Sequence, residues 1–321
     1  AGQDVTILND VIVNTNTVDL GNLTVNSGVT LSIGAYTVSV DGTYDATGGN
    51  TTFTDAGTLK LSGAVTSLGT FTKATNCTVE YDGASQDVIG LNASASQSYY
   101  NLTINGSGTK LLNGNAKIYG DLTLTASDFD LNGNTIYPVS NITRASGNLI
   151  AGSNSNITYT TGSAHNLCAF SDNNISVKTS GTTTKTITTT GNIDCRIIDL
   201  SNKNSTFLVD GETVTIDEKL DIEEGTFQIT SGTIDINDGT NDALIIVTSD
   251  AKLDIDGGTV NVGGSGDSNS ELDMTNGTLE ISAGTLNIND ELDVADGTIT
   301  QTGGTINIKN YVGSGSGTST G

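Results

Sequence analysis

The 321-residue chain has a single proline, no tryptophan, one histidine and three cysteines, and only 12 of its residues are lysine or arginine. Three cysteines do not make a disulfide framework in a chain of this length. The basic residues are few and do not cluster, whereas nucleic-acid binding requires a positive stripe against phosphate. No apolar run approaches the roughly 18 residues of a membrane span. The sequence therefore predicts neither a disulfide-rich domain, nor a nucleic-acid-binding protein, nor a membrane-spanning chain.

Threonine, asparagine, serine and glycine supply most of the polar mass, with 52, 33, 30 and 40 copies respectively. These are turn formers and a β-branched residue, and helix formers are scarce. Apolar residues make up only 35% of the chain, but leucine, isoleucine and valine are numerous. This composition favours an all-β protein with many short strands. The Thr/Asn/Gly-rich, Lys-poor composition indicates an extracellular or cell-surface protein. A first residue that is Ala1 rather than Met indicates either a removed signal peptide or a start chosen within a longer chain.

The last third of the chain carries an internal repeat with a seven-residue step. A Gly-Thr pair precedes an apolar alternation, as in Gly225-Thr226-Phe227 and Gly232-Thr233-Ile234. Each predicted strand has a second inward residue two positions after its first inward residue. This second residue is apolar except at Thr248 and Gln301. The predicted first inward residues are Leu220, Phe227, Ile234, Ile246, Leu253, Val260, Leu272, Leu279, Leu286, Leu292, Ile299 and Ile306.

Alternation with period two is typical of a strand with one buried face, and three such strands would make one coil. The predicted coil-to-coil shifts are 26, 26 and 20 residues, with the additional residues at one corner, 237–242 and 263–268. A β-sandwich of hairpins would not keep the seven-residue step over three strands. The prediction is an all-β, three-sided parallel β-solenoid (right-handed β-helix) of roughly 13–14 coils.

The repeat also divides the chain. Residues 1–140 are predicted as less regular solenoid coils and residues 141–211 as irregular coils. Residues 212–310 carry the regular three-strand repeat, and residues 311–321 form a Gly/Ser/Thr-rich tail predicted to be flexible.

Three segments of the first half resemble a known group of proteins: Tyr99-Tyr100-Asn101-Leu102-Thr103-Ile104-Asn105-Gly106, Lys110-Leu111-Leu112-Asn113-Gly114-Asn115 and Gly120-Asp121-Leu122-Thr123-Leu124. They are similar to repeats of large secreted bacterial surface proteins, the adhesin-like right-handed β-helix proteins that include type IX secretion cargo. The resemblance is close over roughly residues 85–140 and only general over the remainder of the chain. It implies a β-helix fold and a surface location.

The outward positions of the third strand form the first candidate site. In-register stacking would place threonine beside threonine and asparagine beside asparagine, and stacked amides can hydrogen-bond along the solenoid. Such rows either stabilise a solvated face or form a recognition face for a glycan, a surface or ice. Ice binding would favour Thr-x-Thr rows, which do not recur at the coil spacing. The residues of this face are Thr233, Asp235, Thr259, Asn261, Thr285, Asn287, Thr305 and Asn307.

The outward positions of the first strand form the second candidate site, predicted as Asp221, Val247, Asp273 and Asp293. Residues 210–321 hold 21 acidic and 3 basic side chains, out of a net charge of −24 for the whole chain. Carboxylates about 5 Å apart repel one another unless they are solvated, screened or bridged by a hard cation. Asp221, Asp273 and Asp293 are therefore candidate calcium ligands on what is otherwise an acidic, solvated face, and no other cofactor is predicted.

Two further groups contain residue types that can carry chemistry. His165 and Cys168, with Cys195, form a poor metal set, and Cys77 and Cys195 alternate with apolar residues as core thiols do. Catalysis on polysaccharides would need positioned carboxylates or a base beside bound calcium, and the chain has only two arginines.

The sequence therefore predicts a non-enzymatic extracellular structural protein, a rigid solenoid displayed on a surface or assembled into a filament. Its predicted partners are further copies of itself, by head-to-tail stacking or strand exchange, or a cell surface or glycan. The alternatives are an adhesin module that binds a glycan or a surface through its Thr/Asn ladders, and a polysaccharide-active β-helix enzyme.

Overall fold

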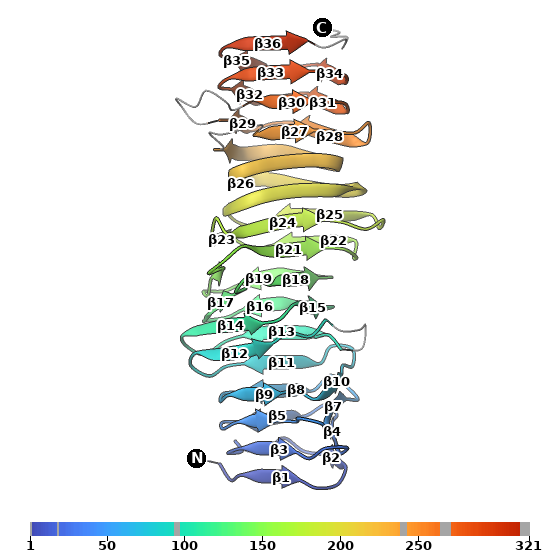
Figure 1. Cartoon of the computed structure of the whole chain (residues 1–321), viewed down its shortest axis with the longest axis vertical. Coiled ribbons are helices and arrows are strands. Elements are labelled where there is room, and N and C mark those ends of the chain that lie inside the picture. Colours follow the sequence, from blue (N-terminus) through green and yellow to red (C-terminus); the bar gives the residue numbers. More distant parts are fainter. Residues whose placement is uncertain (1, 18, 93–96, 238–242, 264–270, 315–321) are drawn as a thin grey trace. The chain divides into compact units, whose positions relative to one another are not determined.

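A computed structural model describes residues 2–17, 19–92, 97–237, 243–263 and 271–314 (Figure 1). The described residues contain strands and no helix, and the strands belong to parallel coils that stack into a β-solenoid of about 14 turns. The predicted fold class is therefore confirmed. The chain divides into two compact units, Ala1–Ser155 and Asn156–Gly321, so that the division falls inside the segment predicted to be irregular.

The first unit is built from strands of two to five residues separated by tight corners. These strands are β1 (Val5–Ile7), β2 (Val11–Val13), β3 (Leu23–Val25), β4 (Thr30–Ile33), β5 (Thr37–Val40), β6 (Tyr44–Asp45), β7 (Asn50–Phe53), β8 (Thr58–Leu61), β9 (Val65–Ser67), β10 (Thr70–Thr72), β11 (Thr78–Tyr81), β12 (Gln86–Ile89), β13 (Asn101–Ile104), β14 (Thr109–Asn113), β15 (Ala116–Ile118), β16 (Leu122–Leu124), β17 (Asp128–Asp130), β18 (Thr135–Pro138), β19 (Ile142–Arg144) and β20 (Leu149–Ile150). Strand β21 (Ser155–Tyr159) begins at the last residue of this unit.

Most strands of the first unit pair in parallel with the equivalent strand of the next coil, so that equivalent residues stack, although β9 and β10 are terminal strands of their sheets. The order β5-β8-β11-β13-β16-β19 gives the longest such row. Its inward residues form one continuous apolar column, each at most 1% exposed: Val38, Leu59, Val79, Leu102, Leu122 and Ile142. Alternation of inward apolar and outward polar residues thus produces a narrow core with one layer per coil.

The second unit follows the same plan with longer strands at its start. Its strands are β22 (Ala164–Leu167), β23 (Phe170–Ser171), β24 (Ile175–Thr179), β25 (Lys185–Thr189), β26 (Ile193–Ile236), β27 (Leu244–Ile246), β28 (Ala251–Ile255), β29 (Thr259–Val262), β30 (Leu272–Met274), β31 (Thr278–Ile281), β32 (Thr285–Ile288), β33 (Glu291–Val294), β34 (Thr298–Gln301), β35 (Thr305–Ile308) and β36 (Tyr311–Ser314). Strand β26 stays extended through its corners for 44 residues and winds through successive coils (Figure 1).

Three rows of strands form the faces of the regular part of this unit. The first row is the segment around Leu220 in β26 followed by β27, β30, β33 and β36, and the second is the segment around Phe227 followed by β28, β31 and β34. The third row is the end of β26 followed by β29, β32 and β35. Three strands per coil were predicted, and the second and third rows have the predicted register.

The first row corrects the prediction in one coil. Leu244 pairs with Leu220, and Ile246 pairs with Ile222, so Leu244 is the first inward residue rather than Ile246. Thr248 therefore lies after the strand instead of interrupting its inward column. Of the corner segments predicted to hold the additional residues, 237–242 and 263–268, residues 238–242 and 264–268 lie outside the described residues. At the chain's end, Tyr311–Ser314 pairs with β33, so strand pairing extends four residues into the predicted tail.

Glycine is required at corners where the backbone takes a positive φ. Gly284 has φ of 78°, and a Cβ atom built on it would lie 2.6 Å from the carbonyl oxygen of Gly258, in the neighbouring coil. Gly258 itself has φ of 68°. Only glycine adopts this backbone at no steric cost, which explains the Gly-Thr pairs that open the repeated strands.

Candidate binding groove lined by an asparagine ladder

A polar groove of about 510 Å³ lies on the third face of the second unit. It follows the row formed by the end of β26, β29, β32 and β35, and it contains two rows of outward residues from successive coils. The lining residues are Asp235, Asn237, Asn261, Gly263, Asn287, Ile288, Asn289, Asn307, Ile308 and Lys309. Four of these, Asp235, Asn261, Asn287 and Asn307, belong to the recognition face that the sequence predicted.

The predicted threonine and asparagine columns are in register. Thr233, Thr259, Thr285 and Thr305 pair from coil to coil, and so do Asp235, Asn261, Asn287 and Asn307. The Nδ2 atom of Asn261 donates to Oδ1 of Asp235 at 2.7 Å, and Nδ2 of Asn287 donates to Oδ1 of Asn261 at 2.7 Å. Asn307 continues the series with a 2.8 Å bond to Asn287. We call these four side chains the asparagine ladder.

The ladder has a direction, because every amide donates toward the preceding coil. It ends on the carboxylate of Asp235, which accepts the bond from Asn261. An amide nitrogen carries two hydrogens, and the ladder uses one of them. The second N–H of each asparagine is therefore available to a ligand in the groove. Since coils stack about 4.8 Å apart, the face offers one donor at each such step.

A second row runs beside the ladder, two residues farther along each strand, and consists of Asn237, Gly263, Asn289 and Lys309. Gly263 has no side chain, which leaves a gap in this row, and the Asn289 amide donates to the Gly263 carbonyl oxygen. Lys309 is exposed and makes no ion pair among the described residues. The groove thus combines amide donors and acceptors with a carboxylate in its first coil and an ammonium group in its last.

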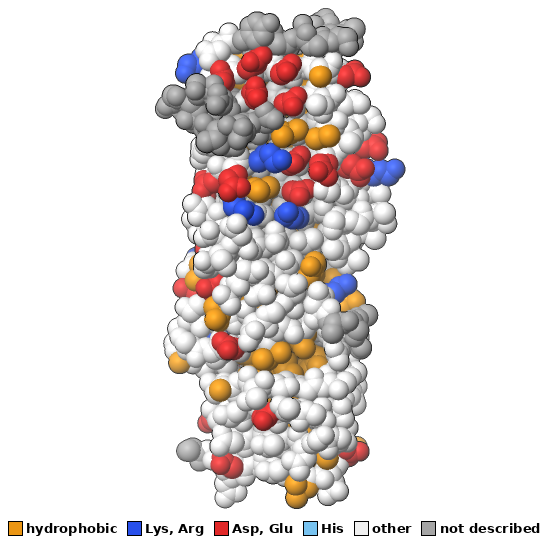
Figure 2. All heavy atoms as spheres, in the orientation of Figure 1, with side chains coloured by type: hydrophobic (Ala, Val, Ile, Leu, Met, Phe, Trp, Pro, Cys, Tyr) orange, Lys and Arg blue, Asp and Glu red, His pale blue; other side chains and the backbone are white. Residues whose placement is uncertain are grey.

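The acidic column of the first face differs from its prediction. Asp221 pairs with Ile245, Ile245 with Asp273, and Asp273 with Asp293, so Ile245 occupies the position predicted for Val247. Asp221 also forms an ion pair with Lys219 at 2.6 Å. No group of three or more His, Cys, Asp or Glu side chains among the described residues is arranged to hold a metal ion. Of the three predicted calcium ligands, Asp273 and Asp293 are therefore adjacent, whereas Ile245 separates Asp221 from them. Acidic side chains gather over this unit on the face drawn in Figure 2.

The cysteines and the histidine are interior residues. Cys77, Cys168 and Cys195 are buried and form no disulfide, as predicted for Cys77 and Cys195, and burial raises the pKa values of the Cys77 and Cys195 thiols. His165 is 1% exposed and its ring lies 4.7 Å from the ring of Tyr159. A raised thiol pKa disfavours the reactive thiolate at neutral pH.

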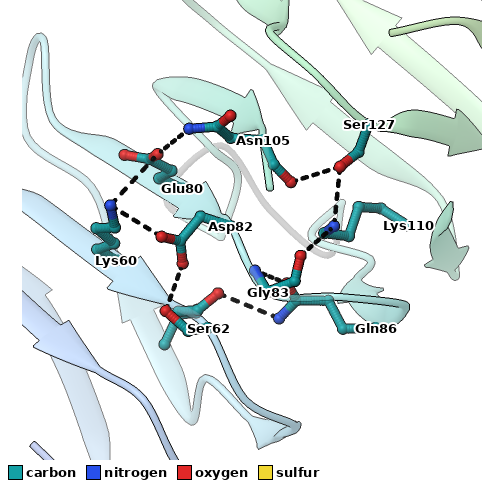
Figure 3. Close-up of polar contacts among 10 residues, drawn as sticks. Lys60, Ser62, Glu80, Asp82, Gly83, Gln86, Asn105, Lys110 and Ser127 are labelled. Atoms are coloured by element: carbon teal, nitrogen blue, oxygen red, sulfur yellow. Dashed lines mark hydrogen bonds and ion pairs between the residues drawn. The ribbon is translucent and has the colours of Figure 1, made fainter. Parts of the chain in front are cut away.

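A buried lysine in the first unit was not predicted. Lys110 is 0% exposed, and its Nζ atom donates to the carbonyl oxygens of Gly83 and Ser107, both at 2.9 Å, and to Ser127 Oγ at 3.1 Å (Figure 3). Burial lowers the pKa of Lys110. Its donors are used on a corner of the solenoid, and Lys185 in the second unit is buried in the same way, with its Nζ donating to Ser180 O at 2.6 Å. Both lysines hold corner carbonyls.

A network of partly buried polar groups lies beside Lys110 (Figure 3). Lys60 forms an ion pair with Asp82 at 2.8 Å, and Ser62 Oγ donates to the same carboxylate at 2.7 Å. Gln86 accepts from the Gly83 N–H at 2.9 Å and donates to the Gly63 carbonyl at 2.8 Å. These bonds join two successive coils, so the network stabilises the stack.

The first coil has an open, apolar hollow of about 420 Å³. Strands β1 and β2 are the terminal strands of their sheets among the described residues. Val11 faces inward yet is 39% exposed, and Leu8 is 65% exposed. We call this hollow the first-coil mouth, and it is lined by Val5, Thr6, Ile7, Leu8, Asn9, Asp10, Val11, Val13, Thr17, Leu20, Leu23, Leu31 and Val38.

The stacked coils, the ladder and the mouth define a repeat protein of the parallel β-solenoid class. No protein-family model, no curated protein and no solved structure matches the chain. In the described parts of the chain, no helix is long and apolar enough to cross a membrane.

Proposed function

We propose that the protein is a non-enzymatic structural solenoid that works outside the cell and associates with further copies of itself through its end coils. The observation that carries this proposal is the first-coil mouth, where inward apolar residues meet solvent and two strand edges lack a parallel neighbour among the described residues. Unpaired edges of this kind accept a further strand readily.

The coils at the other end of the chain supply a matching surface. Ile299, Ile306 and Ile308 face inward but are only half-buried, whereas their neighbours one coil earlier are at most 2% exposed: Leu279, Leu286 and Ile288. Every strand pairing described is parallel, so a second copy continues the stack when its first coil meets these residues. Burial of apolar side chains on both surfaces would favour that contact.

Composition and chemistry support the extracellular, non-catalytic part of the proposal. Threonine, asparagine, serine and glycine dominate the chain, and the acidic excess disfavours polyanionic partners. The buried cysteines have raised thiol pKa values, and the buried lysines spend their donors on corner carbonyls. An activity on polysaccharides remains the alternative that an assay must address.

The test is the association state of the chain as a function of concentration. We expect sedimentation velocity to show species larger than the monomer as concentration rises, and electron microscopy to show end-joined particles. Val11→Lys introduces a charge at the mouth and is expected to shift the chain to monomer. Tyr36→Lys is the matched control, because Tyr36 is 38% exposed, against 39% for Val11, and does not line the mouth.

A chain that remains monomeric at all concentrations would overturn the proposal, and so would association that Val11→Lys and Tyr36→Lys reduce equally. Circular dichroism melts of both variants show whether each is folded. If Val11→Lys fails to fold, Leu8→Lys replaces it, since the Leu8 side chain is 65% exposed. Turnover of a plant or bacterial polysaccharide by the purified chain would favour the enzyme alternative.

A further inference from the structure

We propose that the asparagine-ladder groove of the second unit is a binding site for a neutral oligosaccharide. The groove lies on the side of the coils rather than at their ends, so this function is independent of end-to-end association. Two outward rows of the third face line it, and its volume of about 510 Å³ is within the range of small-molecule sites.

The ladder presents the polar groups that recognise hydroxyls. Asn261, Asn287 and Asn307 each use one Nδ2 hydrogen in the ladder, at 2.7, 2.7 and 2.8 Å, and keep the other for a ligand. Because the amides hold one another in place, little side-chain freedom remains to be lost when a ligand binds. The donors recur once per coil, which suits a ligand that is itself a repeating chain.

The second row complements the ladder. Asn237 and Asn289 add amide groups, and Gly263 between them leaves room for a bulky ring. A sugar has hydroxyls at its edge, and these amides can donate to and accept from them.

Charge selects among possible saccharides. Residues 210–321 carry 21 acidic and 3 basic side chains, so a sulfated or polyuronate chain approaches against a negative field. The groove itself contains one carboxylate, Asp235, and one ammonium group, Lys309, and its other polar side chains are amides. A neutral chain of hydroxyls hydrogen-bonds to all of these groups without that repulsion.

The experiment uses the whole chain on an array of cello-, xylo- and manno-oligosaccharides and oligomers of N-acetylglucosamine, with polyuronates and sulfated glycans as the anionic arm. We expect binding to at least one neutral series, and affinity is then measured in solution by calorimetry. Asn287→Ala removes the central amide and is expected to weaken binding by about two- to tenfold or more. Asn204→Ala is the matched control, since Asn204 is an exposed asparagine of the same unit outside the groove.

Hydrogen exchange gives a readout that needs no variant. With a bound oligosaccharide, peptides covering β32 and β35 are expected to gain protection, while those covering β31 and β34 on the second face are not. The proposal is overturned by three results: no binding to any neutral series, binding to anionic glycans alone, or equal affinity in Asn287→Ala and Asn204→Ala. Protection confined to strands outside the third face would contradict it too.

Discussion

Tyrosine hydroxyls inside the solenoid show how single residues adapt to a core only a few side chains wide. Tyr44 is 0% exposed and shares a 2.6 Å hydrogen bond with Thr51 Oγ1, which in turn donates to the Leu68 carbonyl. Tyr81 and Tyr99 share a bond of 3.0 Å. Each of these buried hydroxyls therefore has a polar partner, which offsets the cost of removing it from water.

These tyrosines predict instability at high pH. Burial raises the pKa of Tyr81 to about 12, and it also raises the pKa values of Tyr44, Tyr99 and Tyr159. A group whose folded pKa lies above its unfolded value of 10.0 keeps its stabilising contribution below that value and loses it as pH rises through the folded pKa. We expect the melting temperature to fall as pH rises above about 10, measured by circular dichroism between pH 8 and 12.

Tyr44→Phe checks the cause. The variant should lose about 1 kcal/mol near pH 7, because the hydrogen bond to Thr51 is gone, and should show a shallower decline above pH 10. Tyr36→Phe, at a position that is 38% exposed, is the control and should follow the wild type. An identical alkaline decline in Tyr44→Phe and the wild type would refute the assignment to Tyr44.

At the scale of the strand and its corner, the glycines set where each coil turns. Gly284→Ala would place a methyl group 2.6 Å from the Gly258 carbonyl oxygen on a backbone with φ of 78°. We expect a loss of about 1–3 kcal/mol, seen as a lower melting temperature. Gly34→Ala is the control, because a Cβ there meets no heavy atom closer than 3.8 Å and its φ is not positive. Equal melting temperatures for the two variants would show that the corner does not constrain Gly284.

The strands also show what the sequence could and could not predict. The Thr-x-Asn pattern predicted both the threonine column and the asparagine ladder. Their register follows from the spacing of Thr259, Thr285 and Thr305 alone. The predicted position of the first strand in one coil was wrong by two residues. Leu244 and Ile246 are both apolar, and a shift of two residues keeps the same face of the strand inward. Lys110 escaped prediction because a charged residue is ordinarily outward, and only the corner carbonyls around it explain its burial.

The groove depends on side-chain contacts that composition does not encode. The alternation placed Asp235, Asn261, Asn287 and Asn307 outward, but the hollow beside them arises from Gly263 and from the row two positions farther on. A periodic pattern predicts which face a residue occupies, whereas the depth of a groove also depends on the sizes of the side chains in the neighbouring row. The first-coil mouth was not predicted, because the exposure of inward residues depends on which strands cover them.

At the scale of the whole molecule, the net charge of −24 acts against compactness through self-repulsion. We expect the melting temperature to rise when sodium chloride is increased from about 10 to 150 mM, because screening shortens the range of the repulsion. Calcium and magnesium at equal ionic strength should have equal effects, since Ile245 separates Asp221 from Asp273 and leaves Asp273 and Asp293 as the adjacent pair of this column. A melting temperature that calcium alone raises and a chelator lowers would instead support the calcium column.

The register between β32 and β35 has a consequence for how the gene can gain or lose coils. Thr285 and Thr305 occupy equivalent positions, so residues 285–304 are one complete layer that begins after Gly284 and ends at Gly304. An in-frame loss or duplication of the codons for this coil would restore a Gly-Thr pair at the junction. The threonine column and the asparagine ladder would both remain continuous. Recombination within the gene can therefore change the number of coils and the length of the asparagine ladder, because each new junction is again a Gly-Thr pair.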